Sequence, residues 1–434
     1  MNARFFHLKY PSRFRPLERK VRTSMKIKDL KVICTAPDRI RLVIVKVETE
    51  SGEYGLGCAT FTQWPLTVVS ALENYLKPLI MGRDSEEISD IWQAMYLSGY
   101  WRNGGVLNNA IAGVDQALWD LKGKLANKPV YDLVGGKVRK FLETYVHVNG
   151  ANAEEIVNKI ESLEARGFKN FRIQVSLSGV AGYGSGTSFE SKYGIQTRQD
   201  YRLSLQQDPW DENLYVTSTL SVLREVRNRK PNIGIIHDVH ERVSPQIAIS
   251  ISKQVEDLNL IFLEDPFAPE DLEYLENMKL QSRTPIAIGE LFSSAHEYTR
   301  VISERWIDFI RCHITQIGGF TPALKLAHLA ESFGVRTAWH GPGDLSPVGH
   351  AAHMHLGALT ANFGIQEVYL HGENSEKVFK GIPEISNGHL LINDRPGFGI
   401  DLDFDAALEF PFPEHPFNGA WPEIRRIDGT IIRP

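Results

Sequence analysis

Three carboxylates follow three consecutive apolar stretches of the sequence at equal intervals. Asp238 stands in IIHDVH, Glu264 in IFLEDP and Glu290 in AIGELF, and neighbouring members of this trio are 26 residues apart. Successive β/α units of a barrel produce such a spacing when each strand presents a side chain at the same level. Converging carboxylates repel one another, and hard oxygen donors suit Mg²⁺ better than zinc or copper. The pattern therefore predicts one divalent metal ion per chain, with these three residues as its ligands.

Each of these residues also has a structural interpretation when it is taken alone. Asp and Glu often cap helices or form salt bridges, but the equal spacing of the trio after apolar strands favours the metal site. His240 lies two residues after Asp238. Because side chains alternate along a strand, we expect both residues to face the same barrel mouth. A structural histidine is the alternative for His240.

Eight short apolar stretches, most of them followed by a helix-like segment, supply the elements for such a barrel. Most connections run about 18 to 25 residues, enough for one helix and two loops. The second stretch is followed instead by a glycine- and serine-rich insertion, GVAGYGSGTSFESKYG, which continues to about Trp210. An insertion at this end of a strand is typical of an active-site loop. The eight stretches are TYVHVNG, NFRIQVS, IGIIHDVH, LIFLEDP, PIAIGEL, FIRCHIT, VRTAWHG and FGIQEVY.

The chain before the barrel has a different pattern. From Met25, MKIKDLKVICTA and RLVIVKVETESGEYGLGCAT alternate apolar and polar residues around a Glu-Ser-Gly turn, which is typical of antiparallel strands. Residues 65–93 and 107–126 have apolar residues at helical spacing. Strands followed by helices predict a separate α+β unit. The stretch from Gly372 onward has no clear period, and its hydrophobic content predicts that it packs back on this first unit.

Composition and charge narrow the functional classes. With 434 residues, 42% hydrophobic and 23% charged, the chain is typical of a two-domain globular protein. A net charge of -5 provides no basic field for nucleic acid. The three cysteines are too widely spaced for a disulfide framework, and no apolar run reaches the roughly 18 to 20 residues of a membrane span. We therefore expect a soluble, cytoplasmic protein, with residues 1–24 as a non-structural leader.

Several motifs together resemble the mandelate racemase-like group of the enolase superfamily. They are ALWDLKGKLANKPVYDLVGG, the carboxylate trio in DVH, LEDP and GEL, and the late WHG. The pairing of Asp238 with His240, the strand that carries Arg172 and Gln174, and HGPGDLSPVGHAAH are similar to the mannonate dehydratase subgroup. This resemblance implies an α/β fold, a modified (β/α)7β TIM-type barrel. Its expected parts are an α+β capping domain over residues 25–140, the barrel with its metal site over 141–371, and a C-terminal segment, 372–434, packed on the cap.

The same resemblance implies a carbon–oxygen lyase that acts on acid sugars. D-Mannonate or D-gluconate would be converted to 2-keto-3-deoxy-D-gluconate. The proton beside the carboxylate would be removed, Mg²⁺ would stabilise the enediolate, and the 3-hydroxyl would then leave. The resemblance implies Tyr183, aided by Arg172, as the base and His240 as the acid. Tyr193, which is also followed by glycine in the insertion, is the alternative to Tyr183.

A second group of residues is implied to bind the substrate. A polyol needs many partners, because each buried hydroxyl left unpaired costs about 1 to 3 kcal/mol. Most of the group ends other predicted strands, whereas one member, Trp421, lies in the C-terminal segment and has simple core packing as its alternative. The group comprises His147, Arg311, His340, Glu367 and Trp421.

Two other functions compete with dehydration of an acid sugar. Epimerisation or racemisation could use the same metal, but the Lys-x-Lys pair typical of racemases is replaced by Arg172 and Gln174. A low-turnover homologue that binds or senses a sugar acid is the second alternative. It would fit the two departures from the subgroup, at Pro342 and at Arg39–Arg41. We expect a small-molecule acid sugar as the partner, a homo-oligomer, and neither nucleic acid nor membrane binding.

Overall fold

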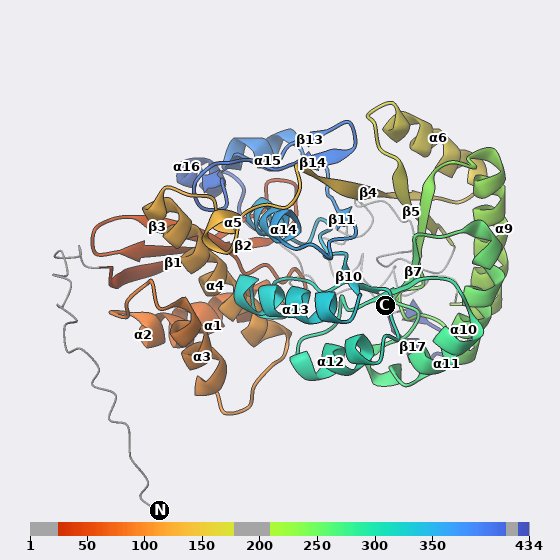
Figure 1. Cartoon of the computed structure of the whole chain (residues 1–434), viewed down its shortest axis with the longest axis horizontal. Helices are drawn as coiled ribbons and strands as arrows, with labels where there is room; N and C mark the ends of the chain where they lie inside the picture. The colour runs from red at the N-terminus through yellow and green to blue at the C-terminus, as the bar shows by residue number, and fades with distance from the viewer. Residues whose placement is uncertain (1–24, 178–208, 414–423, 434) are drawn as a thin grey trace, which may run out of the picture.

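The chain begins with a three-stranded antiparallel sheet. The structure is a computed structural model and describes residues 25–177, 209–413 and 424–433. Strands β1 (Ile27–Thr35), β2 (Leu42–Thr49) and β3 (Tyr54–Cys58) pair in the order β1-β2-β3. The turn at residues 50–52 contains Gly52 at φ 96°, a conformation that favours glycine. The alternating pattern in this segment thus corresponds to a sheet with one face against the helices of the cap (Figure 1).

Five helical segments cover this sheet. They are α1 (Pro65–Ala71), a π-helical turn η1 (Leu72–Leu76), α2 (Lys77–Ile80), α3 (Ile88–Ser98) and α4 (Gly105–Ala126). The predicted helical region 65–93 is interrupted by a turn after Ile80, where Gly82 has φ 75°. Helix α4 lies so close to β3 that a Cβ on Gly57 would come within 1.9 Å of the carbonyl oxygen of Gly113. Only glycine allows this approach.

Eight parallel strands form the barrel, as the sequence predicts. Neighbouring strands from β4 to β10 pair in chain order, and β11 pairs with β4. A parallel bridge between Thr337 and Phe363 joins the β10 and β11 segments and completes the ring. The strands are β4 (Phe141–Gly150), β5 (Asn170–Val175), β6 (Gly234–Asp238), β7 (Phe262–Glu264), β8 (Ile286–Ile288), β9 (Phe309–Ile310), β10 (Arg336–Thr337) and β11 (Gln366–Glu367).

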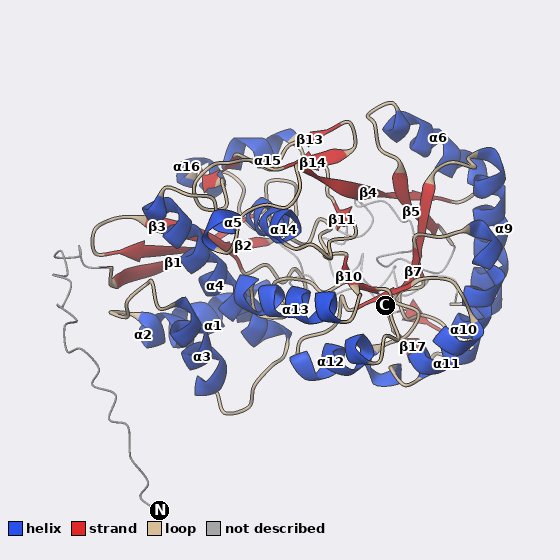
Figure 2. Ribbon diagram, viewed as in Figure 1, coloured by secondary structure: helices blue, strands red, loops and turns tan. Residues whose placement is uncertain are grey.

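The barrel helices lie outside the strands (Figure 2). Side-chain caps begin several of them, including Asn152, Asp211 and a capping box of Ser294 with Glu297. A short helix, α5 (Val130–Leu133), precedes the first barrel strand. The barrel helices are α6 (Ala153–Glu164), α9 (Glu212–Arg229), α10 (Pro245–Gln254), η2 (Glu256–Leu258), η3 (Pro269–Asp271), α11 (Tyr274–Gln281), α12 (Ala295–Ser303), α13 (Phe320–Ser332) and α14 (Pro347–Leu359). Inside the barrel, one buried cluster comprises Tyr145, Ile236, Phe262, Ala287, Phe309, Ala338 and Ile365.

The C-terminal segment returns to the first sheet only in its first part. Its last described residues, 424–433, lie beside the barrel, where Arg433 donates to Asp271 at 3.0 Å, so the prediction that the whole segment packs on the cap is wrong for them (Figure 1). The hydroxyl of Thr35 in β1 donates to the carbonyl oxygen of Ala407 at 2.9 Å, and the hydroxyl of Tyr54 in β3 donates to Asp401 at 2.8 Å. Strand β14 also pairs antiparallel with β4 of the barrel. The elements are α15 (Glu373–Val378), β12 (Phe379–Lys380), β13 (Ile385–Ser386), β14 (His389–Leu391), β15 (Asp401–Leu402), α16 (Phe404–Leu408), β16 (Ile424–Arg425) and β17 (Ile431–Ile432).

Among the described residues, no helix has both the length and the apolar character needed to cross a bilayer.

Candidate metal and substrate site

Three buried carboxylates meet at the ends of strands β6 and β7. Asp238 and Glu264 are the last residues of these strands and are paired in register, and Asp265 follows directly. Each offers an oxygen atom, and these oxygens lie within 4.8 Å of one another. All three side chains are buried. The carboxyl ends of parallel barrel strands thus gather the acids at one point, as the architecture requires.

The oxygen atoms of this group fit a hard cation. In the part of the chain that the structure describes, one buried oxygen of each carboxylate has no hydrogen-bond partner: Oδ1 of Asp238, Oε2 of Glu264 and Oδ2 of Asp265. A buried acceptor without a partner costs free energy, more so when it carries charge. Three buried carboxylates whose oxygens approach within 4.8 Å offer the ligands that Mg²⁺ or Ca²⁺ prefers. The residues present therefore fit a divalent cation bound by oxygen.

Glu290, the third member of the predicted trio, lies across an arginine from this group. It follows β8 directly after Gly289, which has φ 131°. Arg311 donates from Nη1 to Oε2 of Glu290 at 2.9 Å, and its Nη2 lies 3.0 Å from Oε1 of Glu264. The three oxygens within 4.8 Å of one another thus include Asp265 instead of Glu290. The equal spacing of the trio does not include Asp265, although this residue stands beside Glu264 in the LEDP motif.

Two fully buried arginines share the carboxylates of the barrel mouth. Arg172 on β5 donates to Glu264 at 2.5 Å and lies 3.6 Å from Asp238 and 3.5 Å from Glu367. Arg311, just after β9, donates to Glu290 and also to Glu367 at 2.6 Å. Both guanidinium groups have no exposed surface. Buried ion pairs of this kind need nearly complete compensation of charge, which ties each arginine to several acids.

The carboxylates of the barrel mouth outnumber the two arginines that pair with them. Burial raises the pKa of Glu264 to about 8. The charges of Arg172 and Arg311 oppose this rise, and the smaller repulsion from Asp238 and Glu367 adds to it. Burial and the charges of Glu290 and Glu264 raise the pKa of Asp265 well above its ordinary value. Burial also acts on Asp238, but His240 and Arg172 outweigh it and hold its pKa below the ordinary value. A divalent cation would supply the missing positive charge.

His240 reaches Asp238 by a turn and not by strand alternation. Strand β6 ends at Asp238, and His240 and Glu241 both have left-handed backbone angles, φ 55° and φ 50°. This conformation is uncommon for residues other than glycine and is often found at functional sites. Nδ1 of His240 lies 3.3 Å from Oδ2 of Asp238. The expected proximity therefore exists, but the alternation argument that predicted it is wrong.

The structure brings together four of the five predicted substrate-binding residues. Glu367 is hydrogen-bonded to Nε2 of His147 and accepts from Nη2 of Arg311. Nδ1 of His340 lies 3.2 Å from Glu290 and 3.5 Å from Glu367. Burial and the neighbouring Arg172 lower the pKa of His147 to about 4, so this imidazole is neutral at pH 7. Trp421, like the candidate bases Tyr183 and Tyr193, lies outside the described residues.

Two further side chains stand at the same mouth. His313 follows Arg311 by two residues, and Asp344 lies in the turn between β10 and α14. One ligand atom from each of them lies within 4.8 Å of a ring nitrogen of His340. Sequence analysis did not select either residue. The spacing of the sequence offered a signal for His313. It stands two residues after Arg311, just as His240 stands two residues after Asp238.

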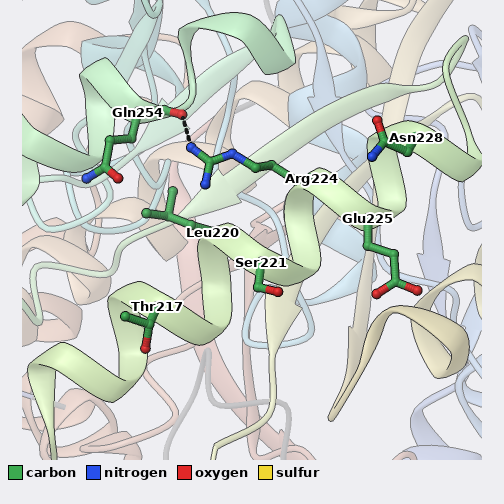
Figure 3. Close-up of a pocket in the computed structure, with 7 residues that line it drawn as sticks. All are labelled: Thr217, Leu220, Ser221, Arg224, Glu225, Asn228 and Gln254. Carbon is green, nitrogen blue, oxygen red and sulfur yellow. Dashed lines mark hydrogen bonds between the residues drawn. The ribbon is translucent and has the colours of Figure 1, made fainter.

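A groove on the outside of the barrel has a different character. It is lined by residues of α9 and by Gln254, the last residue of α10, and has a volume of about 520 Å³ (Figure 3). Nη2 of Arg224 donates to the carbonyl oxygen of Gln254 at 3.1 Å. The lining contains no group of strand-end carboxylates or histidines, so the barrel mouth remains the candidate site. The lining residues are Thr217, Leu220, Ser221, Arg224, Glu225, Asn228 and Gln254.

A closed β/α barrel with buried carboxylates at its strand ends, joined to an α+β cap, defines a class of metal-assisted barrel enzymes. Comparisons with known proteins agree with this class. Residues 155–407 match the model "Enolase C-terminal domain-like", and residues 19–135 match "Mandelate racemase / muconate lactonizing enzyme, N-terminal domain". The chain belongs to this family of the enolase superfamily, and within it to the D-galactonate dehydratase family. The predicted fold class and hydro-lyase class are confirmed.

Individual relatives cover nearly the whole chain. A D-galactonate dehydratase family member from Salmonella virchow is 45% identical over 95% of this chain and 100% of its own length. A family member from Pantoea ananatis is 44% identical over 94% of this chain and 99% of its own length. The crystal structure of a Pantoea ananatis enolase with bound D-gluconate and Mg is 43% identical, with a TM-score of 0.86 and coverage of 94% of this chain and 100% of that one.

Proposed function

We propose that this chain is a Mg²⁺-dependent aldonate dehydratase that converts D-gluconate, D-mannonate or both to 2-keto-3-deoxy-D-gluconate. One observation carries the proposal: three buried carboxylates place oxygens within 4.8 Å of one another at the barrel mouth, and within the described residues each has one oxygen without a hydrogen-bond partner. That arrangement suits a cation and an anionic substrate together. The solved relative that contains D-gluconate and Mg supports this substrate class.

The cation site holds one Mg²⁺ per chain in this proposal. Asp238 and Glu264 are ligands in either of two sets, completed by Glu290 or by Asp265. When bound, the cation would act as a Lewis acid toward the substrate carboxylate. Arg311 bridges Glu264 and Glu290, so it would keep these acids ionised and oriented whether or not Glu290 is a ligand.

The proton steps fall to residues on separate elements. Arg172 lies on β5, directly before the insertion that contains Tyr183, and its charge would favour the tyrosinate that removes the proton beside the substrate carboxylate. His240 is held by Asp238 at the end of β6, where it would donate a proton to the departing 3-hydroxyl. This assignment of base and acid follows the resemblance of the motifs to the mannonate dehydratase subgroup.

The remaining polar groups would orient the sugar acid. His147 is hydrogen-bonded to the buried Glu367, and His340 lies beside Glu367. Because these groups already pair with one another and with Arg311, a polyol would find donors and acceptors in fixed positions. Trp421 would close the pocket from the C-terminal segment.

Turnover on a panel of aldonates tests the proposal. Protein stripped with EDTA is assayed with D-gluconate, D-mannonate and D-galactonate, with and without Mg²⁺, for the 2-keto-3-deoxy product. We expect product only with Mg²⁺, and at least a hundredfold less from Glu264→Gln. Lys325→Gln, on the outer helix α13, serves as the matched surface control.

Binding without product would favour the second candidate, a low-turnover sugar-acid binder. One packing contact supports this second candidate: a Cβ on Gly343 would lie 3.0 Å from Cδ1 of Ile40 and 2.9 Å from Tyr369. The two segments that depart from the subgroup, around Pro342 and Ile40, therefore pack against each other. Deuterium exchange without elimination would favour epimerisation instead.

The proposal also includes a homo-oligomer in the cytoplasm. Trp101 and Tyr100, in the loop between α3 and α4, are 84% and 75% exposed, and Trp64 before α1 is 56% exposed. Exposed aromatic side chains on one domain are typical of a self-association surface. The three cysteines are unpaired, which suits a reducing compartment. Light scattering of wild type and of Trp101→Ser measures the assembly, and a monomeric wild type would contradict it.

A further inference from the structure

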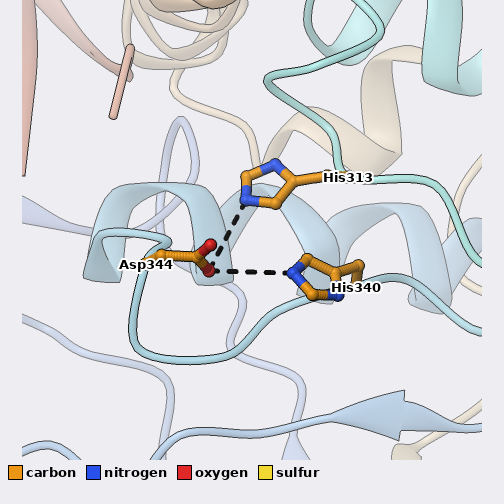
Figure 4. A group of neighbouring side chains, drawn as sticks. All are labelled: His313, His340 and Asp344. Atoms are coloured by element: carbon orange, nitrogen blue, oxygen red, sulfur yellow. Dashed lines mark ion pairs between the residues drawn. The ribbon is translucent and has the colours of Figure 1, made fainter. Parts of the chain in front are cut away.

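A second group of side chains of metal-ligand type lies at the barrel mouth, beside the carboxylates. His313 follows β9, His340 follows β10, and Asp344 lies in the turn before α14 (Figure 4). Each offers one ligand atom, and the three atoms lie within 4.8 Å of one another. We propose that these residues form a separate site for a borderline-soft cation of the Zn²⁺ type.

The distances suit a small tetrahedral ion. Nε2 of His313 lies 3.8 Å from Oδ1 of Asp344, and Nε2 of His340 lies 3.7 Å from the same oxygen. Ligand bonds to zinc of about 2.0 to 2.1 Å place the ligand atoms of a tetrahedron roughly 3.3 Å apart. Side-chain movements of about half an ångström would therefore bring both imidazoles to the tetrahedral distance from Asp344.

The backbone holds the three residues in place. A parallel bridge pairs His313 with His340, and their ring centroids are 5.0 Å apart. The Thr315 hydroxyl lies 2.7 Å from Nδ1 of His313, a second contact of the kind that orients metal-bound imidazoles. A turn from Pro342 to Leu345 fixes the loop that carries Asp344. Little ordering remains to be done when an ion binds.

A buried carboxylate oxygen lies between the two imidazole rings. Oδ1 of Asp344 forms ion pairs with Nε2 of His313 and Nε2 of His340, although within the described residues no hydrogen bond reaches it. A cation between these atoms would satisfy this buried oxygen more fully. The Asp344 side chain as a whole is 26% exposed, which leaves an open side for water as a fourth ligand.

The chemistry of the ligands separates the two sites. Two imidazole nitrogens and one carboxylate select zinc and its neighbours among the transition metals. The group around Glu264 offers only oxygen, which suits Mg²⁺. Mg²⁺ at millimolar concentration would therefore fill one site and leave the other to Zn²⁺.

Occupancy would disturb the substrate pocket through His340. Nδ1 of His340 lies 2.6 Å from Nη1 of Arg311 and 3.2 Å from Oε2 of Glu290. A cation drawn to Nε2 would shift this ring and so disturb both contacts. Zn²⁺ would thus be an inhibitor, a consequence that rests on the proposed dehydratase function.

Cobalt binding tests the site without any assay of activity. Co²⁺ is added to the full chain in saturating Mg²⁺, and visible absorption is recorded, because four-coordinate Co²⁺ absorbs far more strongly than the six-coordinate ion. We expect an intense spectrum that Zn²⁺ abolishes. His313→Gln and Asp344→Asn should each weaken Co²⁺ binding at least tenfold. The matched control is His328→Gln, which removes an exposed histidine 3.8 Å from Glu331.

The outcomes separate this proposal from the dehydratase function. Weak absorption only, or a strong spectrum that survives both His313→Gln and Asp344→Asn, would overturn the zinc site. Circular dichroism shows whether each variant is folded, so a lost spectrum in a folded variant supports the site. If wild type turns over an aldonate, Zn²⁺ should inhibit it at least tenfold more strongly than it inhibits His313→Gln. Equal inhibition would overturn the inhibitory role and leave the binding result intact.

Discussion

The carboxylate of Asp115, in cap helix α4, accepts hydrogen bonds from both the backbone N–H and the hydroxyl of Thr321, at 2.8 and 2.5 Å. Thr321 lies in the first turn of barrel helix α13, so an acid from the cap satisfies the N-terminus of a barrel helix. Asp115 is fully buried. One side chain therefore joins the two halves of the molecule and caps a helix at the same time.

Removal of this link should destabilise the fold. Asp115→Ala should lose about 1 to 2 kcal/mol of unfolding free energy, the usual cost of a lost cap. Asp115→Asn keeps an acceptor for the Thr321 N–H and should lose less. Urea denaturation at pH 7 measures both, with Asp405→Ala in the C-terminal segment as a control. Equal stability of wild type and Asp115→Ala would contradict the link.

Mg²⁺ should stabilise the protein in proportion to its occupancy. At a hundred times its dissociation constant, a ligand specific for the folded state adds about 2.7 kcal/mol. EDTA should therefore lower the melting temperature, and Mg²⁺ should restore it. Glu264→Gln should abolish this response. Comparison of Asp265→Asn with Glu290→Gln then identifies the third ligand, because only that variant should weaken Mg²⁺ at least tenfold. No response of wild type to Mg²⁺ would remove the metal site.

Arg311 should be the most sensitive single position of the barrel mouth. It is fully buried and pairs with Glu264, Glu290 and Glu367. Arg311→Met leaves buried carboxylates without their counter-ion and should cost about 3 to 5 kcal/mol. Saturating Mg²⁺ should recover part of this loss by supplying positive charge. Thermal unfolding of both forms with and without Mg²⁺ measures the effect, and a loss below 1 kcal/mol would refute it.

His355 should contribute to acid lability. Burial lowers its pKa to about 3, and its Nδ1 accepts from the backbone N–H of Tyr131 at 3.1 Å. Because the folded pKa is depressed, the contribution to stability is complete above the unfolded value of about 6.5 and is lost as pH falls toward 3. Denaturation at pH 7.5, 6.0 and 5.0 should show a shallower decline for His355→Gln than for wild type. Identical slopes would exclude this histidine as a source.

His240 and Tyr183 should fail at different steps. Tyr183→Phe should stop exchange of the proton beside the carboxylate in heavy water and leave Mg²⁺ binding unchanged. His240→Asn should retain exchange but lose the 3-hydroxyl slowly, because it lacks the acid. Mass spectrometry of recovered aldonate separates the two variants. Full dehydration by Tyr183→Phe would transfer the assignment of the base to Tyr193.

The barrel could be predicted because each strand has its own signal. Short apolar stretches such as IIHDVH and IFLEDP correspond to β6 and β7, and the residue that ends each strand faces the mouth. Register between neighbouring parallel strands then places Asp238 beside Glu264. Regular geometry made this part of the site predictable from spacing alone.

The remainder of the site depends on turns that have no such regularity. Asp265 has φ 37° and His240 has φ 55°, and these left-handed residues redirect the chain immediately after the strands. Strand alternation therefore cannot position either side chain. Asp344 meets His313 only because β9 and β10 are adjacent in the barrel, a long-range fact that no local pattern contains. The sequence predicts the strand-end residues well and the turn residues poorly for this reason.

The return of the C-terminal segment to the first sheet affects the order in which the protein can fold during synthesis. Thr35 and Tyr54 leave the ribosome early, but their partners near Ala407 and Asp401 are among the last residues made. These contacts of the cap sheet therefore cannot form until the whole barrel has been translated. A ribosome stalled before residue 400 would hold a chain whose barrel strands are complete and whose cap is still open, and this nascent chain would be the natural target for a chaperone.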